Sequence, residues 1–128
     1  MAVRVVQLGS RRIPGEGLRI GTVRRPPRGV PKTEYASRDF YDVWLPELAP
    51  SAALVRLAQG AADEQGWRAF TRKYRAEMRR PEAARLLDLL ASLSRQTDFA
   101  VGCYCVEEGR CHRSLLRALL VERGASLA

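Results

Sequence analysis

Three thiols and the only imidazole of this chain lie within ten residues of one another, close to its C-terminal end. They are Cys103, Cys105, Cys111 and His112. A thiol can act as a nucleophile, a redox group or a metal ligand, and an imidazole can move a proton or bind a metal. Residues 103–112 are therefore the part of the chain best equipped for chemistry.

Cys111 and His112 are the candidate catalytic residues of this segment. We place Cys111 at the start of a helix beside Arg110, His112 and Arg113, where the helix dipole and the positive charges lower a thiol pKa and favour the thiolate. Glu47 is the next candidate, as a carboxylate partner for the histidine. The alternative for a lone histidine at a helix start is anion contact or capping.

The spacing Cys-x-Cys-x5-Cys-His differs from the paired Cys-x2-Cys of structural zinc sites, and adjacent residues seldom bind one ion together. We therefore assign neither metal ligands nor a cofactor from the sequence. A metal- or redox-active cysteine site stays open as an alternative. In the other alternative Cys103 alone, or Cys103 together with Cys105, is a buried and unreactive thiol.

No phosphatase loop starts at Cys103 or Cys105, and the glycine-rich phosphate-binding motifs are absent from the sequence. A phosphatase loop needs Cys, five residues and Arg, but the sixth residue after Cys103 is Gly109 and the sixth after Cys105 is Cys111. Neither a Gly-x-Gly-x-x-Gly after a strand nor a Walker loop is present. The sequence therefore favours neither a dinucleotide site nor a P-loop.

The charge of the chain is concentrated near its N-terminus. The 128 residues carry 22 basic and 14 acidic side chains, a net charge of +8, and residues 1–38 hold nine of the basic but only two of the acidic ones. A local basic surface implies an anionic partner: a phosphate, a nucleotide or a nucleic acid. Most of these side chains are Arg, which suits bidentate contacts to phosphate or carboxylate.

Three apolar or alternating runs predict strands, over residues 3–8, 18–24 and 98–105. A Pro- and Gly-containing turn at residues 14–17 suggests that the first two strands form an antiparallel pair. Periodic apolar residues and capping residues predict the helices. These cover residues 37–44, 52–59, 63–80, 82–95 and 112–123. We expect the aromatic stripe of 63–80 in the core and the leucines of 82–95 to be well buried.

These elements predict an α/β fold, a small single domain over residues 1–128. Its short mixed sheet is flanked by helices, with an N-terminal strand pair and a helical crossover to a C-terminal strand, loop and helix. Strands joined by a crossover run parallel, so the loops after the second and third strands leave the same edge of the sheet. Ligands of open α/β sheets bind at that edge.

The two loops at this edge are the most polar segments of the chain. Arg24 and Arg28 lie in the first loop, and Arg110 and Arg113 lie in the second, around a predicted helix start that itself favours an anion. We expect these four side chains to bind a phosphate or another anionic group. The alternative is that the arginines of the second loop pair with its own two glutamates on a solvated turn.

Length and composition exclude several classes of protein. No window approaches the roughly 18 consecutive apolar residues of a membrane helix, and residues 1–9 lack the apolar stretch of a signal peptide. We expect a cytoplasmic protein without membrane contact. A multidomain enzyme, a fibrous repeat and a disordered chain are also excluded.

Four blocks of the sequence occur in the same order in one known family. They are Arg24-x-x-Pro-Arg-Gly-Val30, Trp44-Leu-Pro-Glu-Leu-Ala-Pro-Ser51, Trp67-x-x-Phe-x-x-x-Tyr-x-x-Glu-Met78 and the apolar strand before the last helix. In these blocks the chain resembles the YeaO-like bacterial proteins, a domain of unknown function. Its Cys-x-Cys to Cys-His-Arg-Ser ending is similar to that of wider relatives. The resemblance implies a compact bacterial α/β domain without an established activity, and it adds Trp44, Glu47, Pro50 and Ser51 to the candidate site residues.

The residues favour a domain that binds a phosphorylated or otherwise anionic small molecule, such as a nucleotide, between the two loops. If the domain is an enzyme, Cys111 or His112 does the chemistry. The alternative from another class is a nucleic-acid-binding module in which the basic N-terminal third contacts phosphates. Against it, no helix-turn-helix and no aromatic RNA-binding strand is evident in the sequence.

Overall fold

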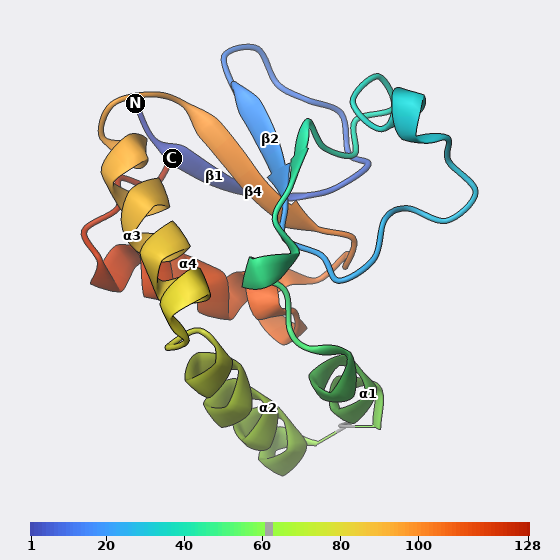
Figure 1. Ribbon diagram of the computed structural model, residues 1–128, viewed down its shortest axis with the longest axis vertical. Coiled ribbons are helices and arrows are strands. Elements are labelled where there is room, and N and C mark those ends of the chain that lie inside the picture. The colour runs from blue at the N-terminus through green and yellow to red at the C-terminus, as the bar shows by residue number, and fades with distance from the viewer. Residues whose placement is uncertain (61–62) are drawn as a thin grey trace.

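A computed structural model describes residues 1–60 and 63–128 and contains one four-stranded sheet (Figure 1). The strands are β1 (Val3–Gln7), β2 (Leu18–Gly21), β3 (Val43–Trp44) and β4 (Phe99–Cys103). Their order across the sheet is β1-β4-β2-β3, and every pairing is parallel. The α/β fold is therefore confirmed, with a sheet that is parallel throughout rather than mixed.

The predicted antiparallel pairing of the first two strands is wrong, because β4 lies between β1 and β2. β4 is the strand whose residues are all buried, and it hydrogen-bonds to a neighbour on each side. An apolar run of this kind buries most of its surface in the centre of a parallel sheet, where both faces are covered. Gly102 permits the close approach, since a Cβ there would lie 2.6 Å from the carbonyl oxygen of Val6.

Four α-helices connect and cover the strands. They are α1 (Ala52–Gly60), α2 (Glu64–Glu77), α3 (Pro81–Ser94) and α4 (His112–Glu122), and short 3-10 turns lie at Lys32–Glu34, Pro46–Leu48 and Glu108–Arg110. In Figure 1, α3 and α4 lie beside the sheet, and α1 and α2 lie at the far end of the molecule. Within the described residues, no helix combines the length and the apolar character that crossing a membrane requires.

Two of the helix starts, those of α1 and α2, follow capping residues that the sequence offers. The Ser51 hydroxyl accepts from the Leu54 N–H at the start of α1, and the Asp63 carboxylate accepts from the Gly66 N–H at the start of α2. The predicted aromatic stripe of α2 is confirmed, with Phe70 stacked between its two aromatic neighbours. These helices therefore form where local sequence and tertiary burial agree.

The prediction for α3 is only partly right. Leu87 and Leu90 are buried, but Leu89 and Leu93 are exposed. α3 packs one stripe against the core rather than being covered on all sides, so leucines on its outer surface face solvent.

The helix predicted over residues 37–44 is absent. Residues 36–40 form turns, with Asp39 at a φ of +64°, and the chain then enters β3 beside β2. The Asp42 carboxylate accepts from the backbone N–H of Arg19 and from the Arg12 guanidinium. These tertiary contacts hold the segment in an extended form that its local sequence does not specify.

A buried ion pair organises the loops around β2. Arg19 is 0% exposed and Glu16 is 3% exposed, and the guanidinium Nε and Nη2 donate to the two Glu16 carboxylate oxygens at 2.8 and 2.9 Å. The Arg19 Nη1 also donates to the backbone carbonyls of Ser10 and Asp39. One cation of the basic N-terminal third is therefore part of the core and not available to a ligand.

The substitution Glu16→Gln is expected to lower the free energy of unfolding by about 3–5 kcal/mol, because it leaves the Arg19 charge buried and unpaired. Glu34→Gln is the control, since its ion pair with Arg38 is about half exposed and contributes about 1 kcal/mol or less. Denaturant unfolding at neutral pH measures both. A loss for Glu16→Gln no larger than that of the control contradicts a structural role for the pair.

The same pair predicts a pH dependence. Burial raises the pKa of Glu16, but the hydrogen bonds and charge of Arg19 outweigh burial and leave that pKa below its ordinary value. A carboxyl with a depressed folded-state pKa stabilises the fold above its unfolded pKa of about 4.3, and this contribution is lost as pH falls below that value. Unfolding curves measured down this pH range are expected to show a steeper loss for the wild type than for Glu16→Gln.

Candidate functional site

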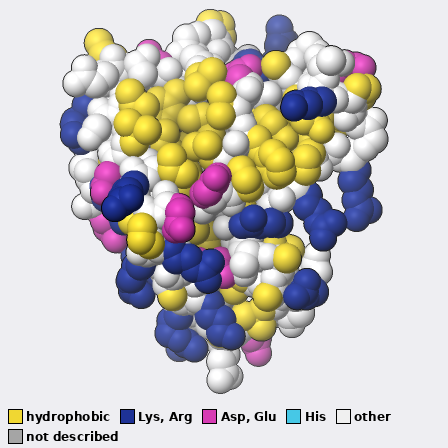
Figure 2. All heavy atoms as spheres, viewed as in Figure 1, with side chains coloured by type: hydrophobic (Ala, Val, Ile, Leu, Met, Phe, Trp, Pro, Cys, Tyr) yellow, Lys and Arg dark blue, Asp and Glu magenta, His cyan; other side chains and the backbone are white. Residues whose placement is uncertain are grey.

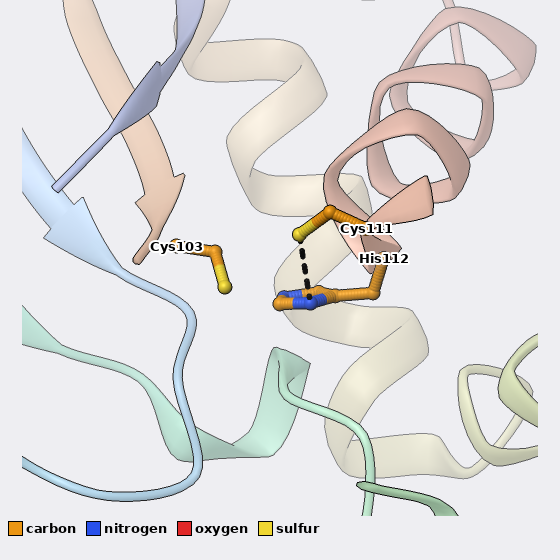
Figure 3. Close-up of side chains that lie close together, drawn as sticks. All are labelled: Cys103, Cys111 and His112. Carbon is orange, nitrogen blue, oxygen red and sulfur yellow. Dashed lines mark hydrogen bonds between the residues drawn. The ribbon is translucent and has the colours of Figure 1, made fainter. Parts of the chain in front are cut away.

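The three thiols and the histidine lie where β4 ends and α4 begins, and Figure 3 shows Cys103, Cys111 and His112 of this group. The Sγ atoms of Cys103 and Cys111 and a ring nitrogen of His112 all lie within 4.8 Å of one another. The Cys111 Sγ is 3.7 Å from the His112 Nδ1, and the Cys105 Sγ is 3.8 Å from the Cys103 Sγ. We call these four residues the thiol–imidazole cluster.

The orientation of His112 is fixed from the opposite side of its ring. Its Nε2 lies 2.8 Å from the backbone carbonyl oxygen of Thr22, and a carbonyl oxygen can only accept a hydrogen bond, so Nε2 carries a proton. In the neutral ring Nδ1 then has the free lone pair, and this atom faces Cys111. The Tyr74 ring packs against the imidazole at a centroid distance of 5.6 Å.

The thiols differ in exposure and in the pKa that their surroundings give them. Cys103 and Cys111 are buried, whereas Cys105 is exposed, so the alternative of a buried Cys105 is wrong. Hydrogen bonding from the Cys103 thiol lowers the pKa of Cys105 and of Cys111, and the charge of Arg113 lowers that of Cys105 further. Donating these bonds raises the pKa of Cys103 itself.

Arg113 lies beneath the loop that carries Cys105. It is 4% exposed, its Nη2 donates to the Cys105 carbonyl oxygen at 2.6 Å, and its Nε has no hydrogen-bond partner among the described residues. Arg110 instead is exposed, pairs with Glu64 at 3.0 Å and lies over the Trp67 ring. The alternative in which both arginines pair with the glutamates of their own loop is therefore wrong.

The Arg24 side chain hydrogen-bonds to nearby backbone carbonyls. Its guanidinium donates to the carbonyl oxygens of Pro46, Ala49 and Pro50, and so fixes the turn that leads into α1. Arg24 and Glu47 also line a cavity of about 190 Å³ whose lining includes none of the thiol–imidazole cluster. The structure therefore brings Glu47 together with Arg24 and not with His112.

The loop after β2 does lie against the segment after β4. The Tyr104 hydroxyl, after β4, donates to the Arg25 carbonyl oxygen at 2.8 Å. From β3, the Trp44 indole nitrogen donates to the Val23 carbonyl oxygen of the same loop at 2.7 Å. Arg28 is exposed, and no ion pair or hydrogen bond of its side chain occurs within the part of the chain that the structure describes. The two polar loops therefore meet at one edge of the sheet, as the parallel order requires.

Two residues of this site were missed by sequence reasoning. Thr22 orients His112 through its backbone carbonyl, a role open to any residue type, so no side-chain signal could have found it. Tyr104 links the two loops, and its position between two cysteines was the only available hint.

The basic side chains extend beyond the N-terminal third. α2 exposes Arg68, Arg72 and Lys73. Figure 2 shows Lys and Arg side chains gathered toward the end of the molecule at which α1 and α2 lie. Charge alone therefore does not single out the edge where the loops meet.

A family model described as "DUF488-N3a: Active DUF488-N3 subclade" matches residues 3–124. No curated protein and no solved structure matches the chain.

The contrast between Arg24 and Arg28 gives a stability prediction. Arg24→Met is expected to lower the free energy of unfolding by about 1.5–3 kcal/mol, because three carbonyls lose a charged donor. Arg28→Met removes an exposed side chain and is expected to change it by about 0.5 kcal/mol or less. Urea denaturation of the two variants checks this difference, and equal losses would contradict the structural role of Arg24.

Proposed function

The chain belongs to the DUF488-N3a family, a DUF488 subclade of unknown function, as its resemblance to YeaO-like proteins indicated. From the geometry of its sheet edge we propose that it binds a phosphorylated or otherwise anionic small molecule. The ligand lies at the sheet edge where the loops after β2 and β4 meet. The thiol–imidazole cluster beside it is the reactive centre.

The observation that carries this proposal is the contact between the two loops. The Tyr104 hydroxyl donates a hydrogen bond to the Arg25 carbonyl oxygen, and the His112 Nε2 donates one to the Thr22 carbonyl oxygen. The carboxyl ends of β2 and β4 therefore share one polar edge. In open parallel α/β sheets, ligands bind at such an edge. The parallel pairing of the two strands is what makes this edge common to both loops.

Several groups at this edge suit an anion. The start of α4 has no side-chain cap, so its first-turn N–H groups and its dipole favour a negative charge. Arg25 and Arg28 are exposed on the facing loop, and their guanidinium groups have no ion pair within residues 1–60 and 63–128. A guanidinium binds a phosphate through two parallel hydrogen bonds, so these two side chains are the natural clamp.

The reactive centre rests on Cys111 and His112. Their side chains face each other, and the imidazole is held in one tautomer by the Thr22 carbonyl. Such a pair serves thiol chemistry or metal binding. The description of the family as an active subclade supports an enzymatic role. Glu47 lines the separate cavity, so we assign it no part in this centre.

Thermal unfolding in the presence of inorganic phosphate, nucleoside monophosphates and sugar phosphates tests the proposal. A ligand at 100 times its Kd is expected to stabilise the protein by about 2.7 kcal/mol. Arg28→Gln is expected to remove this stabilisation while leaving the unliganded protein unchanged. Arg85→Gln is the control, because it removes the same charge from an exposed position on α3.

Two outcomes contradict the proposal. One is the absence of stabilisation by every ligand of the panel, and the other is an equal loss of binding in Arg28→Gln and Arg85→Gln. Binding of DNA or RNA that falls steeply between about 50 and 200 mM salt, without any small-molecule binding, would instead support the nucleic-acid alternative.

A further inference from the structure

We propose that the thiol–imidazole cluster is a zinc site, with Cys103, Cys111 and the Nδ1 of His112 as its buried ligands and Cys105 as the fourth ligand on the exposed side. This inference goes beyond anion binding and does not depend on it, because it stands on the geometry of the cluster. With zinc bound, Cys111 and His112 serve as metal ligands and not as a free reactive pair. Tetrahedral coordination by sulfur and imidazole nitrogen is the preference of Zn²⁺ in proteins.

Two of the distances between the side chains match those expected between ligands of one zinc ion. Zn–S bonds of about 2.3 Å and Zn–N bonds of about 2.0–2.1 Å, at tetrahedral angles, place two sulfurs about 3.8 Å apart and a sulfur and a nitrogen about 3.6 Å apart. The Cys103 and Cys105 sulfurs are 3.8 Å apart, and the Cys111 Sγ is 3.7 Å from the His112 Nδ1. The Cys103 and Cys111 sulfurs and a ring nitrogen of His112 lie within 4.8 Å of one another, and the exposed Cys105 side chain must move toward this group to complete the coordination.

The orientation and tautomer of the His112 imidazole suit a metal ligand. A histidine that binds a metal through one nitrogen usually donates the N–H of the other to a carboxylate or a backbone carbonyl. In His112 the Nε2 proton is directed to the Thr22 carbonyl oxygen at 2.8 Å, which leaves the Nδ1 lone pair facing the Cys111 sulfur (Figure 3). The protein therefore selects the tautomer that metal binding needs.

The adjacency of Cys111 and His112 is no obstacle in this structure. Cys111 is the N-cap of α4 and has an extended backbone, with φ −117° and ψ 153°, whereas His112 is the first helical residue. Because the chain changes direction between them, their side chains turn to the same side. Two consecutive residues in the middle of a helix or strand would point apart.

The charge of the site is balanced by Arg113. Three thiolates and one Zn²⁺ carry a net charge of −1, which is costly to bury without a nearby cation. Arg113 is 4% exposed, binds the Cys105 carbonyl oxygen, and has neither a carboxylate partner nor a partner for Nε in the described part of the chain. A buried guanidinium without a counter-charge is itself unfavourable, so the cation and the zinc–thiolate group stabilise each other.

Metal analysis of the purified full-length protein tests the zinc site. The wild type is expected to contain about one zinc per chain, and the metal-free protein is expected to take up one Co²⁺ with the absorption bands of tetrahedral cobalt–thiolate coordination. C103S, C111S and H112Q are each expected to lose stoichiometric binding. C105S is expected to keep one ion with weaker affinity and a cobalt spectrum of fewer thiolates. V106A is the control, since Val106 directly follows Cys105, is 80% exposed and supplies no ligand.

A readout on the wild type alone keeps the test valid if a variant fails to fold. Alkylation of Cys105, the exposed thiol, is expected to slow when zinc is added to the metal-free protein and to recover when a chelator removes it. Zinc or cobalt uptake below one ion per chain, metal binding without thiolate bands, or full binding by H112Q overturns the zinc site. Anion-induced stabilisation that persists in metal-free protein leaves the proposed function standing when the zinc site fails.

Discussion

The insertion of β4 between β1 and β2 is the constraint on which the rest of this molecule depends. β4 hydrogen-bonds to both neighbours, and all of its residues are buried. Its carboxyl end is thereby fixed beside that of β2, although about 80 residues separate the two strands in the sequence. The turn into α4 must then begin next to Thr22. The contact between Thr22 and His112, and with it the position of the cluster, follows from the order of the strands.

Arginine has two distinct roles in this fold. The loops around β2 are long and irregular, so many of their carbonyls lack partners in regular secondary structure. A guanidinium carries five N–H donors in a fixed plane and can satisfy several carbonyls at once. Arg19 and Arg24 do this from buried and half-buried positions. Part of the net positive charge is therefore a means of ordering loops, and Arg25 and Arg28 are among the basic side chains that remain exposed to solvent.

The anion site and the zinc site are compatible because they use different groups of the same edge. The anion is assigned to exposed guanidinium groups and to backbone N–H groups in the first turn of α4, whereas the metal is assigned to cysteine and histidine side chains. Arg113 links the two, since it lies under the Cys105 loop with most of its surface covered. Zinc bound there would also fix the turn into α4, because two of its ligands, Cys111 and His112, flank the start of the helix.

The fold class, the strand at residues 99–103, the four α-helices with the caps of α1 and α2, and the segment that carries the chemistry follow from the sequence alone. Each of these depends on local periodicity, local capping or residue type, which are properties of neighbouring residues. The loss of the helix predicted at 37–44, the parallel placement of β1 and β2, the separation of Glu47 from His112, and the internal roles of Arg19 and Arg24 are set by tertiary contacts. These features depend on which distant segments compete for the same hydrogen-bonding groups. The close approach of the Cys111 and His112 side chains is also set by tertiary structure. It requires the change of backbone direction at the start of α4 and the carbonyl of Thr22, which follows a different strand.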